Sequence, residues 1–213
     1  MNALQVDLRV AELLASRLCH DLVSPIGAVN NGMELLEEDL DPEMVGDAVK
    51  LASGSARQAS ATVQFYRLAF GQAGQQVEMD PAQLRRLAEG YLGPHKANLD
   101  WRADQLISDG PDGTGKLLLN LVALALEALP RGGTIVAGAD LSDGVHIGVS
   151  AEGQAARLRD ESAAALRPDA DVGTLTPRSV QAYFTQLVAT RLGGKLAVQD
   201  ETDRLIFQVR LAG

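Results

Sequence analysis

His20 lies within a short run of residues that could transfer a phosphoryl group, Arg17-Leu18-Cys19-His20-Asp21-Leu22-Val23-Ser24-Pro25. Neutral imidazole is well populated near neutral pH and is a competent nucleophile, and a phosphorylated imidazole nitrogen remains a good phosphoryl donor. Asp21 could orient the ring by a hydrogen bond or act as a base, and Arg17 could pair with a phosphate or with a carboxylate of a partner protein. Because such transfer passes through a loose transition state, positioning and charge neutralisation supply most of the catalysis.

The helical phase of this segment turns His20 away from its apolar seam. At about 100° per residue, Leu18 and Leu22 lie on one face and His20 lies roughly opposite to them. The same outer arc carries residues that are polar or small, namely Ser16, Arg17, Ser24, Gly27 and Asn31. We therefore expect an exposed histidine within a flat, accessible patch.

The element that must hold His20 is a long amphipathic helix. Apolar or small residues recur at alternating steps of three and four from Leu8 to Leu36, and Pro25 inside this pattern predicts a kink. Asp41-Pro42 can begin a second helix that runs to about Phe70 with a seam of small residues. One such hairpin cannot enclose a core, whereas two hairpins form a four-helix bundle. We therefore predict a homodimer through a helical hairpin, residues 1–76.

A second domain is expected over residues 77–213, after a linker at 71–76. Helical patterns cover residues 81–90, 113–129 and 177–192, and strand patterns cover 98–102, 134–140, 145–150, 195–199 and 204–211. This order predicts a mixed sheet with helices on one face. The fold class is therefore α+β, a helical hairpin followed by an α/β sandwich.

The composition argues against several kinds of partner. Asp and Glu total 28 against 19 Lys and Arg, for a net charge of −9, so nucleic acid and anionic membranes are poor candidates. The most apolar stretch, 117–129, falls short of the roughly 20 residues needed to cross a bilayer. The N-terminus does not resemble a secretory signal, and the single Cys19 suits a reducing compartment. We therefore expect a cytoplasmic protein.

The segment around His20 resembles the phospho-acceptor box of histidine kinases, where a His, an acidic residue and a later Pro recur. The longer stretch RLCHDLVSPIGAVNNGMELLE is most similar to the ChpT-type histidine phosphotransferases. The resemblance implies that His20 is phosphorylated beside Asp21, and that Arg17, Ser24, Gly27 and Asn31 contact a receiver domain. It further implies a phosphoryl group that arrives from the receiver aspartate of a hybrid histidine kinase and leaves to response regulators of the cell cycle. The receiver would supply the Mg²⁺, and this chain would need no cofactor.

The second domain resembles a histidine-kinase ATPase domain of the Bergerat type that has lost its nucleotide motifs. Asn120 is kept, but Leu124 stands where the family has a metal-holding Asn, and Leu offers Mg²⁺ no oxygen. Ala151 replaces the Asp that binds adenine, and the lid segment 174–179 lacks its glycines. We therefore expect no ATP binding, an Asn120 satisfied by a neighbouring loop, and a domain kept for docking and stability.

Other functions compete with this interpretation. The first is an ATP-consuming sensor-kinase core that phosphorylates His20 itself, and the second is a non-catalytic dimeric adaptor that only binds receivers. A surface histidine without any role is the plainest alternative. A metal site at Cys19-His20 is another, although His95 and His146 stand alone without ligand spacing.

Overall fold

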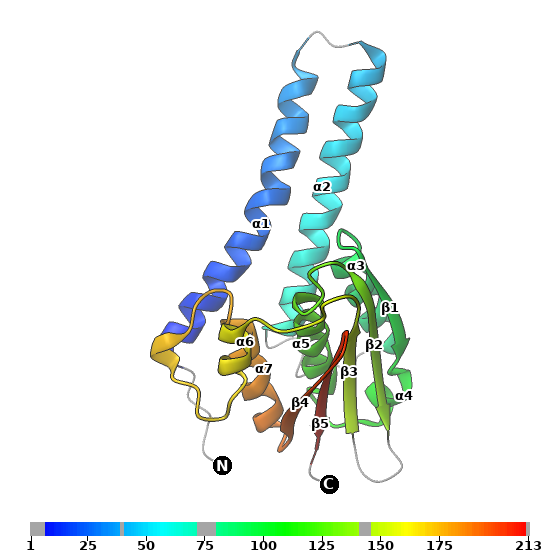
Figure 1. The fold of residues 1–213 in the computed structure, drawn as a ribbon. Coiled ribbons are helices and arrows are strands. Elements are labelled where there is room, and N and C mark those ends of the chain that lie inside the picture. The colour runs from blue at the N-terminus through cyan, green and yellow to red at the C-terminus, as the bar shows by residue number, and fades with distance from the viewer. Residues whose placement is uncertain (1–6, 39–40, 72–79, 141–145, 212–213) are drawn as a thin grey trace.

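The computed structural model describes residues 7–38, 41–71, 80–140 and 146–211 of the chain. A two-helix stalk projects from an α/β domain (Figure 1). The stalk consists of α1 (Leu8–Leu36) and α2 (Pro42–Ala69). The helices of the domain are α3 (Pro81–Leu92), α4 (Asp104–Asp109), α5 (Thr114–Glu127), α6 (Asp160–Ala165), η2 (Val172–Thr174) and α7 (Val180–Arg191). Its strands are β1 (Ala97–Arg102), β2 (Gly133–Asp140), β3 (His146–Glu152), β4 (Lys195–Glu201) and β5 (Arg204–Arg210).

The two stalk helices begin where the sequence provides caps. The Asp7 carboxylate accepts a hydrogen bond from the Arg9 amide, and the Asp41 carboxylate accepts from the Glu43 and Met44 amides. Helix α1 continues without a break through Pro25, and its N-terminal part leans away from α2 (Figure 1). The predicted helical hairpin is therefore confirmed, while the homodimer stays a prediction.

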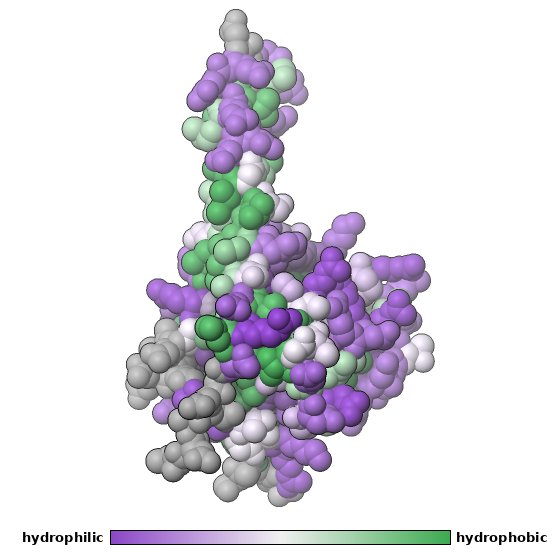
Figure 2. Space-filling model, turned by 90° about the vertical axis from the view of Figure 1, so that its left-hand side faces the viewer, coloured by the Kyte–Doolittle hydropathy of each residue, from purple (hydrophilic) through white to green (hydrophobic). Residues whose placement is uncertain are grey.

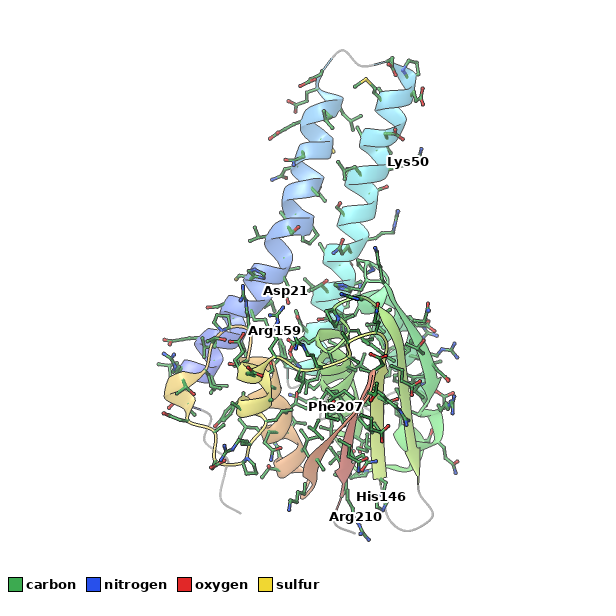
Figure 3. The ribbon with its side chains drawn as sticks, viewed as in Figure 1. Asp21, Lys50, His146, Arg159, Phe207 and Arg210 are labelled. Carbon is green, nitrogen blue, oxygen red and sulfur yellow. The ribbon has the colours of Figure 1, made fainter. Side chains whose placement is uncertain are left out.

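The five strands form one mixed sheet in the order β1-β2-β3-β5-β4. Strands β1 and β2 are parallel, and the other neighbours are antiparallel, with Phe207 of β5 opposite Val149 of β3 and Val198 of β4. Helices α5 and α7 pack on this sheet, and Leu121, Ile135 and Phe207 are fully buried. Phe207 lies on β5 within this core (Figure 3). The predicted α+β class and mixed sheet are confirmed.

The sequence patterns missed three short elements, α4, α6 and η2. Each spans six residues or fewer, too short for a helical period to show. The helix expected from Pro177 begins instead at Val180. The expected boundary at residues 76/77 and the turn at 142–144 lie outside the described residues, so the division into domains stays a prediction.

The end of α2 is held by buried polar side chains of α5. The Lys116 ammonium group donates to the carbonyls of Phe70 and Gly71 at 3.0 and 2.9 Å. The Asn120 amide donates to the carbonyl of Ala69 at 2.8 Å. Side chains of the stalk and the domain also share one apolar core, in which Phe65 and Tyr66 of α2 pack with Leu84 of α3. These contacts hold the base of the stalk on the domain.

Burial of Lys116 makes stability depend on pH. Desolvation, aided by the charge of Arg191, lowers the pKa of Lys116 from 10.5 to about 8. Between these values the unfolded chain binds one proton more than the folded chain, so this group makes stability rise with pH through the window. We therefore compare the free energy of unfolding of wild type with that of Lys116→Met. The difference, wild type minus variant, should increase by about 1 kcal/mol per pH unit above pH 8. Urea titrations at pH 7.5, 8.5 and 9.5 measure this, and a constant difference would contradict it.

The two stalk helices approach closely at Gly32. A Cβ atom built on Gly32 would lie 2.9 Å from the Ala52 Cβ and 3.0 Å from the Ala48 carbonyl oxygen. No atom lies within 4 Å of the corresponding position on Gly27, in the same helix. The small residues of the predicted seam therefore do permit close packing of the hairpin.

This difference predicts opposite effects for the same substitution in one helix. Gly32→Ala forces the helices apart and should destabilise the protein by about 1–3 kcal/mol. Gly27→Ala meets no neighbour and should stabilise by roughly 0.5–1 kcal/mol, because glycine is a poor helix former. Urea unfolding of the two variants measures both values. Equal effects would contradict the close approach at Gly32.

Candidate functional site

His20 lies on α1, near the level at which the stalk meets the α/β domain, as its neighbour Asp21 shows in Figure 3. Its side chain is 86% exposed, so the imidazole projects from the helix as its phase predicts. The expected accessible histidine is therefore present. A rigid helix presents it, which suits a reaction that depends on positioning.

Asp21 contacts the imidazole of His20 and is itself hydrogen-bonded to Tyr66. Its Oδ1 atom lies 3.1 Å from His20 Nδ1, and its Oδ2 atom accepts a 2.5 Å hydrogen bond from the Tyr66 hydroxyl on α2. Arg17 Nε lies 3.8 Å from the same Oδ2 atom. The geometry fits the orienting role considered for Asp21, because a carboxylate beside Nδ1 favours the ring tautomer that carries a proton there.

Arg17 does not lie where its helical phase suggests. Its side chain is only 11% exposed, and its guanidinium group binds Glu127 at the end of α5, with 2.6 Å between Nη2 and Oε1. It also donates to the carbonyl of Arg178 at 3.0 Å. The expectation of an accessible Arg17 is wrong, because the α/β domain covers this side of α1 and occupies the guanidinium group.

The surroundings of Arg17 keep its guanidinium group protonated. Burial lowers the pKa of Arg17, but the charge of Glu127 and the nearby Tyr66 and Tyr91 outweigh it, so the pKa is raised overall. Arg17 Nε is buried and has no hydrogen-bond partner among the described residues. Arg17 is therefore a permanent cation behind Asp21, joined to the second domain.

The other expected contact residues lie on the same face of α1 as His20. Ser16, Ser24 and Asn31 are exposed, and Ser16 donates to the Glu12 carbonyl at 2.9 Å. Gly27 is half-buried, with open space where a Cβ would stand. Their proposed contact with a partner stays a prediction.

Tyr66 and Tyr91 belong to the site although the sequence patterns did not single them out. Tyr66, 1% exposed, was expected only as a seam residue, and its hydroxyl lies 3.3 Å from that of Tyr91 on α3. Burial, and then the neighbouring Tyr91, raise the pKa of the Tyr66 phenol far above its usual range. The phenol therefore stays a donor to Asp21. The sequence signal that could have identified Tyr66 is a tyrosine within a seam of small residues, because a buried hydroxyl needs a hydrogen-bond partner.

The residues that the sequence aligns with nucleotide motifs make contacts within the protein. Asn120 is fully buried, its amide bonds Ala69 and Lys116, and its Oδ1 accepts from Gln181 at 2.8 Å. It was expected to be satisfied by a loop, and it is satisfied by α2, α5 and α7 instead. Leu124 and Ala151 are buried. In segment 174–179, which was compared with the lid, Thr176 donates to Glu161 at 2.8 Å.

Two kinds of feature are absent from the described residues. Among them, no three His, Cys, Asp or Glu side chains lie together as a metal site would require. No described helix is both long and apolar enough to cross a membrane. His95 nevertheless lies near the site: burial lowers its pKa, and the charge of Asp21 opposes that shift.

An exposed histidine on a helix, with a carboxylate 3.1 Å from its ring, is an arrangement that suits a phosphoryl carrier. The family model for the histidine phosphotransferase C-terminal domain matches residues 81–204. Protein phosphotransferase ChpT of Brucella abortus (strain 2308) is 35% identical over 202 residues, covering 94% of each chain. A solved bacterial phosphotransferase is 32% identical and covers 98% of each chain with a TM-score of 0.78.

The chain belongs to the histidine phosphotransferase family. This membership makes it a phosphotransferase of a phosphorelay, and it decides against both the autokinase and the non-catalytic adaptor.

Proposed function

We propose that this chain accepts a phosphoryl group on His20 from the receiver aspartate of a hybrid histidine kinase and passes it to the aspartates of response regulators. The 86% exposure of the His20 side chain is the observation that carries this proposal, because a second protein must reach the ring. The carboxylate of Asp21 at 3.1 Å supports it further. The cytoplasm is the proposed compartment, since an exposed single Cys19 suits reducing conditions.

The bonds of the proposed step balance without a cofactor in this chain. The Nε2 lone pair attacks phosphorus, the bond between phosphorus and the receiver's aspartyl oxygen breaks, and its electron pair leaves with that carboxylate. Nδ1 keeps its proton, so the phosphorylated ring is a cation whose charge Asp21 balances at 3.1 Å. Transfer to a response regulator is the same step reversed. The Mg²⁺ that neutralises the transferred group belongs, in this proposal, to the receiver.

The proposed receiver surface is the face of α1 around His20. Ser16, Ser24 and Asn31 offer polar contacts there, and Val23 adds an apolar side chain that is 70% exposed. The open space over Gly27 admits a partner's backbone. Arg17 is excluded from this surface, because Glu127 occupies it.

The proposed homodimer buries the apolar surface of the stalk. Figure 2 shows apolar side chains along the stalk below a hydrophilic tip. Ile26 and Met33 of α1 and Val45 and Val49 of α2 are among them, each between 39% and 53% exposed. Exposed apolar patches on soluble proteins mark interaction sites, and a second hairpin would complete a four-helix bundle.

A charge in this patch should separate the two subunits. We expect Val49→Glu to turn a dimer into a monomer, since a carboxylate would be desolvated in the bundle core. Light scattering after size exclusion measures the mass. Val198→Glu is the matched control, because this 39% exposed valine lies on β4, outside the stalk. A wild type that is monomeric at micromolar concentration would contradict the dimer.

The transfer itself is tested with one labelled partner. A receiver domain carrying a labelled aspartyl phosphate is mixed with the chain, and label that is lost in acid but kept in base is expected at His20. Label from ATP alone, without a partner, would contradict the proposal and favour a kinase. Bound ATP is not expected, because Leu124 supplies no oxygen to Mg²⁺ and Asn120 is fully hydrogen-bonded.

A further inference from the structure

His20 and Asp21 are neighbours in the sequence, and this makes their contact unusual. On a helix, residues i and i+1 do not face each other, because useful side-chain pairs lie three or four positions apart. Yet Asp21 Oδ1 lies 3.1 Å from His20 Nδ1. An aspartate without further contacts would exchange between side-chain rotamers. Something must therefore hold the carboxylate toward the ring.

Tyr66 supplies that hold from the opposite helix. Its hydroxyl donates to Asp21 Oδ2 at 2.5 Å, so the second oxygen is anchored and the first is left to face the histidine. Tyr66 itself cannot move easily. It is 1% exposed, its ring is stacked on Phe70 with 4.6 Å between centroids, and it meets Phe65 edge-on at 5.8 Å.

The second domain supports the same carboxylate oxygen by two routes. The Tyr91 hydroxyl of α3 lies 3.3 Å from the Tyr66 hydroxyl. Glu127 of α5 binds Arg17, whose Nε lies 3.8 Å from Asp21 Oδ2. The contacts that reach the reactive ring thus begin in the α/β domain and pass through α2 and α1.

We infer that Tyr66 is a positioning residue that acts through Asp21 to hold His20 in its Nδ1–H tautomer, which leaves the Nε2 lone pair free for the phosphoryl group. This inference rests on the proposed function only in naming what Nε2 receives. The tautomer is a property of the unphosphorylated protein. A neutral imidazole has one donor and one acceptor nitrogen, and the hydrogen bond at one of them decides which.

The test is the tautomer of His20 measured by ¹⁵N NMR on the full chain. Wild type should show mainly the Nδ1–H form when the ring is neutral. Tyr66→Phe keeps the aromatic packing but removes the donor, so the Nε2–H fraction should rise and transfer from a labelled receiver should slow about tenfold. Tyr183→Phe is the control, because this half-buried tyrosine of α7 takes no part in the chain of contacts.

A double-mutant cycle separates positioning from a structural role. If Tyr66 acts through Asp21, then Tyr66→Phe should change neither the tautomer nor the rate in an Asp21→Ala background. Additive effects, or a wild type with the Nε2–H form, would overturn the inference whether or not the variants fold well. If instead wild type accepts no label while the tautomer still depends on Tyr66, the proposed function fails and the positioning role stands.

Discussion

His20→Gln should abolish label from a phosphorylated receiver, with at least a thousandfold loss of transfer, because no other group in the patch around it can replace its nucleophile. The fold should not change. The side chain is 86% exposed, and among the described residues its polar contact is to Asp21, so the free energy of unfolding should shift by no more than about 0.5 kcal/mol. Rapid-quench labelling and urea unfolding measure the two effects on the same sample.

His95→Gln is the matched control for this result. His95 lies close enough to Asp21 for the carboxylate to influence its pKa, but it is not presented on α1. It should keep transfer within about twofold of wild type, as expected for a side chain outside the reacting groups. Label that persists in His20→Gln and disappears in His95→Gln would reassign the phosphorylated residue.

Glu127→Gln should destabilise the protein by about 2–4 kcal/mol, because it leaves the buried Arg17 cation without its partner. The pair is close, with 2.6 Å between Arg17 Nη2 and Glu127 Oε1, and the side chains are 11% and 24% exposed. It also joins the stalk to the second domain. Urea unfolding followed by circular dichroism measures the loss.

The Arg85–Glu89 pair on the surface of α3 gives the comparison. Its side chains are 50% and 45% exposed, so Glu89→Gln should cost no more than about 0.5 kcal/mol. Replacing both buried partners, in Arg17→Met with Glu127→Leu, should recover much of the lost stability, since no unpaired charge remains. Equal losses of unfolding free energy in Glu127→Gln and Glu89→Gln would show that the buried pair stabilises the protein no more than the exposed one.

The position of His20 could be predicted because one helix determines it. The steps of three and four from Leu8 to Leu36 fix the buried side of α1, and an exposed ring follows from the phase alone. The same reasoning failed for Arg17, only three residues earlier. The hairpin leaves that side of α1 open, and it is the α/β domain, through Glu127 and Arg178, that covers it.

The orienting tyrosine shows a second limit of sequence patterns. Tyr66 fits the small-residue seam of α2 as an apolar position, and its spacing reveals nothing about its hydroxyl. Its partner Asp21 lies 45 positions away in the chain, and Tyr91 lies 25 positions away. Contacts of this kind depend on the crossing of three helices. A local period cannot supply that information.

The sequence predicted that Asn120 does not bind a ligand, but it did not predict the hydrogen-bond partners of Asn120. The loss of the neighbouring motif residues, with Leu124 and Ala151 in their places, predicts that Asn120 is no longer a ligand. A buried amide must still be hydrogen-bonded, so some protein contact had to replace the nucleotide. That the contact is the last turn of α2, through the carbonyl of Ala69, could come only from the structure.

Lys116 and Asn120 donate hydrogen bonds to the carbonyls at the end of α2, and these bonds hold the stalk in its orientation on the α/β domain. In the proposed docking at His20, a receiver therefore meets the stalk and the α/β domain together. In that docking, the outline of the receiver has to fit both surfaces for its aspartate to reach the ring. Selection among related receivers would then depend on molecular shape as well as on the side chains that touch.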